Sequence, residues 1–198
     1  MDIFADMETP IFQTIYGDHL LKSKDSREFC KAHTRVELPQ GTLLLKAGKI
    51  AKEFYLIEKG VFRSYLYDYD GNEITTEYYC QNDILIESFS LFHRLASKEN
   101  FQAVTNGTVW KIEYDIFQQF LNKVEGLREW GRIWSTNQLY ILKQRSIESI
   151  TVTATERYIR LVKDRPEIIK HCPLKYIASY LGITDTSLSR IRKEIATP

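Results

Sequence analysis

Residues 174–193 carry the pattern that most restricts the fold of this chain. The segment reads IASYLGITDTSLSRIRK from residue 177, and its apolar side chains recur at helical spacing on both sides of Gly182. At Gly182 the chain must reverse, and glycine adopts the left-handed backbone of such a turn most easily. Thr184 can cap the second helix through its hydroxyl, and the small Ala178 lies where two helices would cross closely. The pattern predicts a helix-turn-helix, and a chance helical hairpin is the plainer alternative.

The second predicted helix has an outward face suited to double-stranded DNA. With Leu188 and Ile191 turned inward, polar side chains face outward, and the N-terminal part of such a helix meets base edges in the major groove. Arg190 can donate two hydrogen bonds to guanine. Hydroxyls at the helix start suit phosphate, and basic side chains attract DNA of any sequence, although any one of them can instead be merely solvated. The predicted DNA-binding residues are Lys175, Thr184, Asp185, Thr186, Ser187, Ser189, Arg190, Arg192 and Lys193.

The charges are distributed unevenly, in agreement with this prediction. The whole chain has a formal net charge of +1, but residues 151–198 carry nine basic and five acidic side chains. The remaining residues are therefore net acidic, and only the C-terminal part is suited to a polyanion. The chain has no apolar run of about 18–20 residues, and its start, MDIFADMETP, lacks the features of a secretory signal. We expect a cytoplasmic protein without membrane contact.

The middle of the chain is typical of an antiparallel β domain. From residue 36 to residue 113, short apolar runs alternate with turn residues at close spacing. Asp70–Gly71 separates two long β-rich runs and predicts a hairpin. Several short strands in this arrangement favour a jelly-roll-like sandwich. Residues 8–33 have helical spacing in part, interrupted at Gly17.

A long helix is predicted between this β domain and the helix-turn-helix. Residues 123–150 contain no proline, and a stripe of side chains recurs there at steps of three and four. The stripe could pack on its own domain, but its length favours pairing with a second copy of the chain, in which Asn137 would fix the register. The predicted dimer-interface residues are Trp130, Ile133, Trp134, Asn137, Tyr140 and Ile141.

The connection from the long helix to the C-terminal motif has three predicted pieces. The β-branched run TVTAT at 151–155 indicates a hinge. An amphipathic helix follows, with Tyr158, Ile159 and Val162 on one side. A loop containing Pro166 and Pro173 then leads into the helix-turn-helix.

This order of elements resembles the Crp/Fnr family of bacterial transcription regulators. The resemblance rests on LPQGTLLLKAGKIAKEFYLIEKGVFRSYLYDYDGNE in the front half and IASYLGITDTSLSRIRK in the back half. It implies an α+β fold: an N-terminal antiparallel jelly roll with flanking helices, a long dimerisation helix and a C-terminal winged helix-turn-helix. The corresponding boundaries are 1–122 for a cyclic-nucleotide-binding-like effector domain, 123–150 for the helix and 151–198 for the DNA-binding domain.

The resemblance also bears on the effector. Family members that bind cyclic nucleotides pair a Gly-Glu-Leu turn with an Arg-Ser-Ala segment, and the glycine and arginine serve the phosphate. The matching positions here read Ile86-Glu87-Ser88 and Ser97-Lys98-Glu99, so the glycine and the arginine are missing and Glu99 adds a negative charge. We therefore expect cyclic AMP to be bound poorly. The candidate effector-pocket residues are Glu87, Ser88 and Lys98.

Other functional classes find less support in the sequence. A jelly-roll enzyme of the cupin type needs clustered metal ligands, and an iron–sulfur sensor needs a cysteine cluster near the N-terminus. Haem binding stays open, although no pattern favours it. We expect no enzyme activity, no metal and no cofactor, because the histidines and cysteines are far apart: His19, His33, His93 and His171, with Cys30, Cys80 and Cys172.

The sequence thus predicts a sequence-specific DNA-binding transcription regulator that acts as a homodimer on a pseudo-palindromic site. An unknown small-molecule effector and RNA polymerase are further candidate partners. The alternative is a small-ligand sensor whose C-terminal tail contacts protein rather than DNA. A helix-turn-helix distinguishes the two, because the alternative has no use for its polar outward face.

Overall fold

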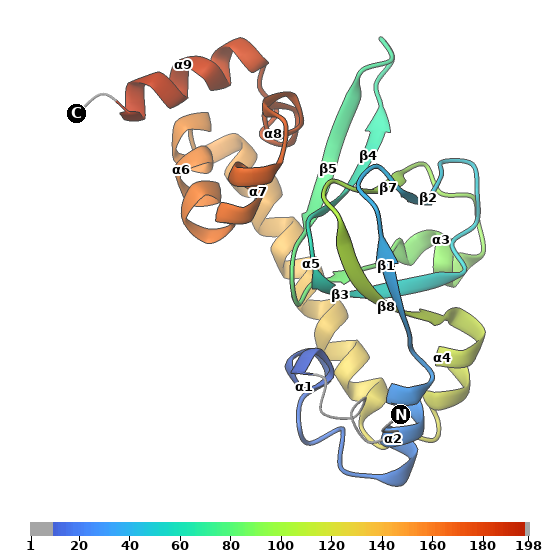
Figure 1. The fold of residues 1–198 in the computed structure, drawn as a ribbon. Helices are drawn as coiled ribbons and strands as arrows, with labels where there is room; N and C mark the ends of the chain where they lie inside the picture. Colours follow the sequence, from blue (N-terminus) through green and yellow to red (C-terminus); the bar gives the residue numbers. More distant parts are fainter. Residues whose placement is uncertain (1–9, 197–198) are drawn as a thin grey trace.

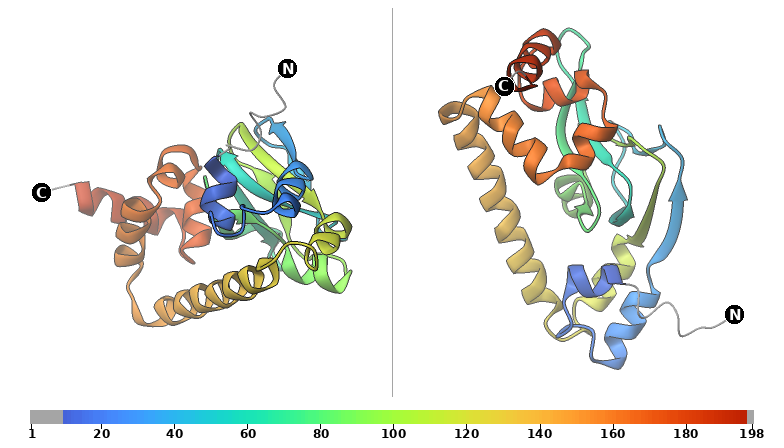
Figure 2. Two further views of the ribbon diagram at one scale, coloured as in Figure 1. Left: turned by 90° about the horizontal axis from the view of Figure 1, so that it is seen from below. Right: turned by 60° about the vertical axis from the view of Figure 1, so that its left-hand side comes forward.

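The computed structural model describes residues 10–196, which form three parts in an α+β arrangement (Figure 1). Two antiparallel sheets make the first part. The long helix α5 (Leu127–Thr151) runs along one side of the sheets, and a cluster of four helices follows it. Figure 2 shows that α5 connects the two ends of the molecule. This is the predicted architecture.

The two sheets each have four strands. In the first, the order is β1 (Thr34–Leu38), β8 (Gly107–Glu113), β3 (Glu53–Lys59) and β6 (Ile84–Leu85). In the second, it is β2 (Leu43–Leu45), β7 (Asn100–Ala103), β4 (Phe62–Tyr67) and β5 (Glu73–Tyr79). All neighbours pair antiparallel, and the chain passes from sheet to sheet as in a jelly roll.

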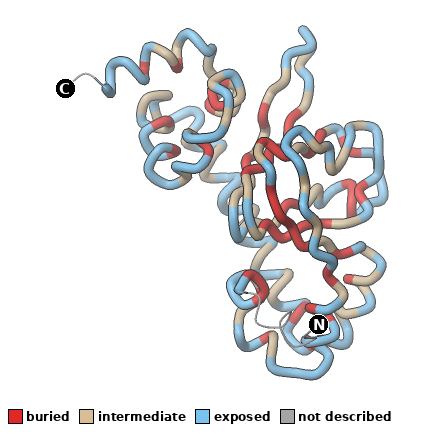
Figure 3. Tube along the Cα trace, in the orientation of Figure 1, coloured by how far each residue is buried: buried red, intermediate tan, exposed pale blue. Residues whose placement is uncertain are grey.

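Alternating apolar side chains from both sheets fill the space between them. Ile57, Phe62 and Val109 are fully buried there, and Figure 3 shows the buried residues concentrated where the sheets face each other. Successive side chains of a strand point to opposite faces, and β3 is covered on both of them: Ile57 lies between the sheets, whereas Leu56 packs in the cluster formed with the helices.

The hairpin predicted at Asp70–Gly71 joins β4 to β5, and the prediction is confirmed. The Asp68 carboxylate accepts hydrogen bonds from the backbone N–H groups of Asp70 (3.0 Å) and Asn72 (2.8 Å). Gly71 has φ +82°, the left-handed backbone that glycine adopts without strain. Figure 1 shows this hairpin projecting beyond the sheets.

Helices close the end of the sandwich that lies beside the start of α5. They are α1 (Pro10–Tyr16), α2 (Lys24–Lys31), α3 (Ser88–His93) and α4 (Tyr114–Phe120). The predicted interruption at Gly17 is confirmed, because α1 ends there and Gly17 has φ +80°.

At the predicted hinge the helix ends and a new one begins. Val152 is extended, and Thr153 caps α6 (Ala154–Asp164) in a capping box with Glu156. The predicted face of α6 is only partly right. Tyr158 is buried, but its buried neighbour is Leu161, while Ile159 (47% exposed) and Val162 (40% exposed) point outward. Leu161 follows Tyr158 by three positions and therefore lies on the same face of the helix. The predicted stripe differs from this buried face by one position along the chain.

The predicted loop before the helix-turn-helix is wrong over its first part, because residues 166–171 form a helix. Pro166 is the first residue of α7 (Pro166–His171), a position where its missing N–H and fixed φ are no disadvantage. Pro173 precedes α8 (Leu174–Tyr180), which is followed by α9 (Asp185–Ala196). Between residues 154 and 196 every regular element is a helix, so no strand of a wing lies within this range. None of the helices within residues 10–196 has the length and apolar composition needed to span a membrane.

Candidate functional sites

Helices α8 and α9 form the predicted helix-turn-helix. Ala178 and Leu188 are completely buried where the two helices meet. Gly182, in the turn, has φ +68°, and the Ile183 N–H donates to the Ala178 carbonyl at 3.0 Å. The Thr184 hydroxyl accepts from the backbone N–H of Ser187 at 3.2 Å, which is the predicted cap. The packing, the turn and the cap therefore match the sequence prediction.

The outer face of α9 is uncovered and polar. Figure 1 shows α9 at the edge of the molecule, directed away from both sheets. Arg190 is 76% exposed, with its Nε 3.7 Å from Glu194 Oε1. The Thr184 and Ser187 hydroxyls are hydrogen-bonded to each other at 3.0 Å as part of the cap. The other predicted DNA-binding side chains are exposed, except for the half-buried Ser189: Lys175, Asp185, Thr186, Arg192 and Lys193.

The long helix α5 has an exposed apolar stripe. Ile133 (48% exposed), Tyr140 (63%) and Ile147 (43%) follow each other at seven-residue intervals. Asn137, which is exposed, lies between the first two of these residues and continues the same face. Within the single chain this face of α5 is open to a partner helix.

The two tryptophans of the predicted dimer interface also have contacts within the chain. Trp130 donates its Nε1–H to the Ile15 carbonyl at 2.9 Å, and its ring packs edge-on against Tyr16. Trp134 is half-buried, stacks with Trp130 and also lines a pocket, and Ile141, 45% exposed, lines the same pocket. The predicted set thus divides into an outer stripe and an inner group.

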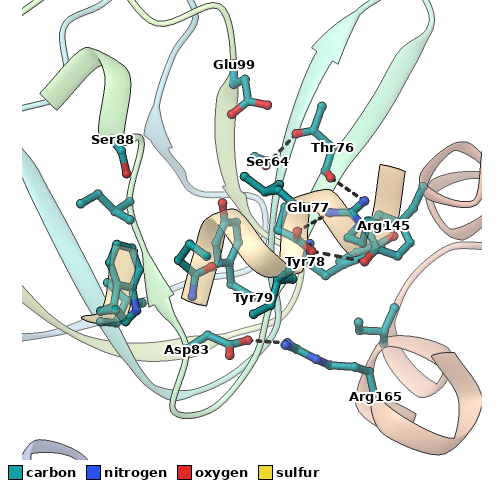
Figure 4. Close-up of a pocket in the computed structure, with 18 residues that line it drawn as sticks. Ser64, Thr76, Glu77, Tyr78, Tyr79, Asp83, Ser88, Glu99, Arg145 and Arg165 are labelled. Atoms are coloured by element: carbon teal, nitrogen blue, oxygen red, sulfur yellow. Dashed lines mark hydrogen bonds and ion pairs between the residues drawn. The ribbon is translucent and has the colours of Figure 1, made fainter. Parts of the chain in front are cut away.

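A pocket of about 370 Å³ lies where the second sheet, α5 and the C-terminal helices meet (Figure 4). The sheet contributes Thr76 and Tyr79, and α5 contributes Trp134 and Gln138. Tyr180 of α8 completes the wall. A molecule in this pocket would contact all three parts of the chain.

Ion pairs hold the walls of this pocket together. Glu77 of β5 accepts hydrogen bonds from Arg145 of α5 and from the Tyr180 hydroxyl of α8, the latter at 3.3 Å. The Arg145 guanidinium also donates to the Thr76 carbonyl at 3.1 Å and lies 4.5 Å from the centre of the Tyr180 ring. Burial raises the pKa of Tyr180 to about 12, so this hydroxyl stays protonated and donates.

A second ion pair joins the sheet to the C-terminal helices. Asp83, after β5, accepts from the guanidinium of Arg165, between α6 and α7 (Figure 4). Sequence reasoning missed both ion pairs. The partners stand 68 and 82 positions apart, and no local pattern connects them.

Comparisons with known proteins identify this arrangement. Residues 35–124 match the family model described as the cyclic nucleotide-binding domain. FixK2 from Bradyrhizobium japonicum has 16% sequence identity and a TM-score of 0.69, over 83% of this chain and 85% of that chain. The c-di-GMP-responsive global regulator CLP from Xanthomonas campestris has 17% identity and a TM-score of 0.62, over 86% and 90%. No curated protein sequence matches the chain.

A third similar structure, from Eubacterium rectale, is described as a transcriptional regulator of the Crp/Fnr family. It has 13% identity and a TM-score of 0.69, over 88% of this chain and 83% of that chain. The chain has the Crp/Fnr fold, with a cyclic nucleotide-binding domain at residues 35–124. At these identities the structures establish the fold of this chain and not its ligand.

The cyclic nucleotide-binding domain has an altered phosphate segment. Glu87 caps α3, where its carboxylate accepts from the Ser90 N–H, and it lines a separate cavity. Ser88 and Ile86 line the pocket between the second sheet, α5 and the C-terminal helices, which we call the central pocket. The Ile86 side chain lies where the resemblance places a glycine. Lys98 is exposed and does not line the pocket, whereas its neighbour Glu99 does.

Glu99 is one of the lining residues that the predicted effector-pocket set omitted. Sequence reasoning noted its negative charge but selected Lys98, because an anion site was the template for the comparison. Residues 98–99 form a bend, in which Lys98 is exposed and Glu99 is half-buried at the pocket wall.

Proposed function

We propose that this chain is a sequence-specific DNA-binding regulator of transcription that acts as a homodimer on a pseudo-palindromic site. The observation that carries the proposal is the uncovered polar face of α9 on a packed helix-turn-helix. Ala178, Leu188 and Ile191 bury the inner side, so the outer side is free to contact a ligand. The net positive charge of residues 151–198 suits a polyanionic partner.

In this proposal α9 enters the major groove. Its N-terminal residues, among them Asp185 and Thr186, meet base edges, and Arg190 donates two hydrogen bonds to a guanine. Thr184 and Ser187 hold the start of the helix in its capped form, and a phosphate binds near that end, where the helix dipole favours anions.

The exposed stripe of α5 supplies the dimer contact. Two copies paired through Ile133, Tyr140 and Ile147 form a parallel helix pair with Asn137 at a polar position of the seam. The two α9 helices then face successive major grooves, about 34–36 Å apart on one side of the DNA. A dimer is the form in which two copies of α9 read an inverted repeat.

The central pocket is the proposed effector site. It contacts the sheet, α5 and α8, and the hinge at Val152 separates α5 from the DNA-binding helices. A ligand that fits one arrangement of these parts better than another shifts the population toward it and changes the spacing of the two α9 helices. Cyclic AMP suits this pocket poorly, because Glu99 lies where a phosphate would need a cation.

The experiment is a substitution of Arg190. On duplexes recovered from a random DNA pool, Arg190→Ala should cost about 1–3 kcal/mol of binding free energy and lose discrimination at one base pair per half-site. Fluorescence anisotropy titrations against the parent duplex and its single-base variants measure this.

Arg192→Ala, on the same helix and equally charged, is the matched control. We expect Arg192 to contact a phosphate, so this substitution should weaken binding to all duplexes alike and lower the salt dependence of binding. A uniform loss for Arg190→Ala would make Arg190 a phosphate contact as well. Unchanged binding for both variants would remove α9 from the DNA interface.

A further inference from the structure

The central pocket contains a carboxylate that no cation pairs. Three carboxylates line the pocket, Glu77, Asp83 and Glu99, against two guanidinium groups, Arg145 and Arg165. Each arginine pairs with one of the first two carboxylates. None of the ion pairs formed within residues 10–196 includes Glu99.

The position of Glu99 is fixed by its backbone. The buried Ser97 hydroxyl accepts from the Glu99 N–H at 3.0 Å and donates to the Glu99 carbonyl at 3.1 Å. The Ser97 backbone in turn bonds to Gly48 and Lys49. Figure 4 shows the Glu99 side chain entering the pocket from its rim, across from Ser88.

The surroundings of Glu99 disfavour its charged form. Burial raises the pKa of this carboxyl above its ordinary value, because a half-buried carboxylate loses hydration, and a hydrogen bond from Thr76 opposes the shift. A cation in the pocket would stabilise the carboxylate, whereas an anion would be repelled at short range.

The rest of the wall is suited to a flat organic body. The side chains of Tyr79, Trp134 and Tyr180 come from the sheet, α5 and α8, and the apolar Ile86 and Ile141 lie beside them. Aromatic side chains attract both flat apolar groups and cations. A volume of about 370 Å³ is within the range of small-molecule sites.

We propose that the central pocket binds a small molecule that carries a positive charge on a flat apolar body, with its cation against Glu99. This inference rests on the proposed function, in which the pocket is the effector site, and it names the chemical class of the effector: an aromatic or heteroaromatic amine, not a cyclic nucleotide. The Ser64 and Ser88 hydroxyls are further hydrogen-bonding partners for such a molecule.

The test is calorimetric titration of the full chain, without DNA, with matched pairs of probes. Tryptamine and tyramine carry the cation, and indole-3-propionate and 3-(4-hydroxyphenyl)propionate carry an anion on the same rings. The cationic member of each pair should bind at least about tenfold more tightly, since the pocket then gains a charge-assisted hydrogen bond to Glu99. Cyclic AMP should bind more weakly than either amine.

Substitutions locate the preference at Glu99. Glu99→Gln keeps the shape and should weaken tryptamine by about tenfold or more while leaving indole-3-propionate unchanged or stronger. Glu99→Asp keeps the charge and should retain the preference for cations. Lys98→Gln alters an exposed neighbour and should change neither titration. Thermal unfolding of each variant checks that it is folded.

The inference would be overturned by equal or tighter binding of the anionic probes, or by tryptamine binding that Glu99→Gln leaves unchanged. Absence of amine binding at millimolar concentration would overturn it as well. Since these titrations contain no DNA, their failure leaves DNA recognition by α9 standing. A failure of the Arg190 experiment would in turn leave the ligand result standing.

Discussion

Arg63 is the side chain that most directly joins the second sheet to the helix-turn-helix. It is fully buried on β4, where its guanidinium donates to Gln102 (2.9 Å) and Thr75 (3.3 Å) and pairs with Glu73. The same guanidinium lies 3.4 Å from the centre of the Tyr176 ring on α8. A buried arginine needs all its donors satisfied, and here its flat face is covered by an aromatic ring of the helix-turn-helix.

His33 performs a similar task between the N-terminal helices. Its Nδ1–H donates to the Phe29 carbonyl at 3.0 Å, so its Nε2 accepts from the Tyr16 hydroxyl at 2.9 Å. This assignment requires a neutral ring. Burial lowers the pKa of His33 to about 4, well below its ordinary value, and hydrogen bonds to the backbone of Phe29 and Cys30 oppose the shift.

The His33 environment predicts a loss of stability in acid. Below the ordinary pKa of about 6.5 the unfolded chain binds a proton at this site and the folded chain does not, so the stabilisation is present above pH 6.5 and is lost as the pH falls toward about 4. The loss over this window should reach about 3 kcal/mol. Urea unfolding at pH 7 and pH 4.5 measures most of this loss in the free energy of unfolding.

The control for this prediction is His33→Gln, which can donate to Phe29 and accept from Tyr16 without titrating. The variant should lack the contribution of His33 to the pH dependence, so its free energy of unfolding should fall less between pH 7 and pH 4.5. The same pH dependence in both proteins would contradict the assignment of His33.

At the scale of elements, the long helix α5 has two different faces. Its inner face lines the pocket with Gln138 and Arg145, and its outer face carries the stripe of Ile133, Tyr140 and Ile147. An exposed apolar stripe at heptad spacing is typical of a helix that pairs.

The stripe predicts that Tyr140→Asp gives a monomer. In a dimer, the introduced carboxylate would lose its hydration and face the same carboxylate of the second copy. Burial of unpaired charges in this way is strongly unfavourable. Sedimentation at micromolar concentration should show half the mass of the parent protein.

Leu139→Asp is the matched control, because Leu139 is 68% exposed against 63% for Tyr140 and lies outside the stripe. It should sediment as the dimer. Monomers from both variants, or dimers from both, would show that the stripe is not the interface.

The elements that could be predicted from the sequence are those with local signals. The β4–β5 turn is set by Asp68 and Gly71, and the helix-turn-helix by Gly182 and Thr184, all within a few positions of the elements that they shape. Helix α7 was missed, because Pro166 was interpreted as a loop residue when it begins a helix.

The pocket could be predicted only in part. The altered phosphate segment was visible in the sequence, but the wall formed by Glu77, Arg145 and Tyr180 joins residues up to 103 positions apart. Only the docking of α8 on the sheet brings these side chains together, and neither spacing nor composition indicates it.

At the scale of the whole molecule, the helix-turn-helix contacts the second sheet through α8 and leaves α9 exposed. Helix α8 contacts the sheet through Tyr176, through Tyr180 and through Ser179, whose hydroxyl accepts from the Thr75 N–H at 3.2 Å. Helix α9 points away from that contact (Figure 2). In the proposed mechanism, a ligand between the sheet, α5 and α8 would act on α8, and α9, which packs on α8, would move with it.

The measurement that tests the central claim most directly is the selection of bound duplexes from a random DNA pool by the full chain. A dimer that reads DNA with α9 should enrich an inverted repeat whose half-site centres are about one helical turn, or a multiple of it, apart. Enrichment of single, unpaired half-sites would contradict the dimer, and a pool that shows no enrichment at all would contradict DNA recognition by this chain.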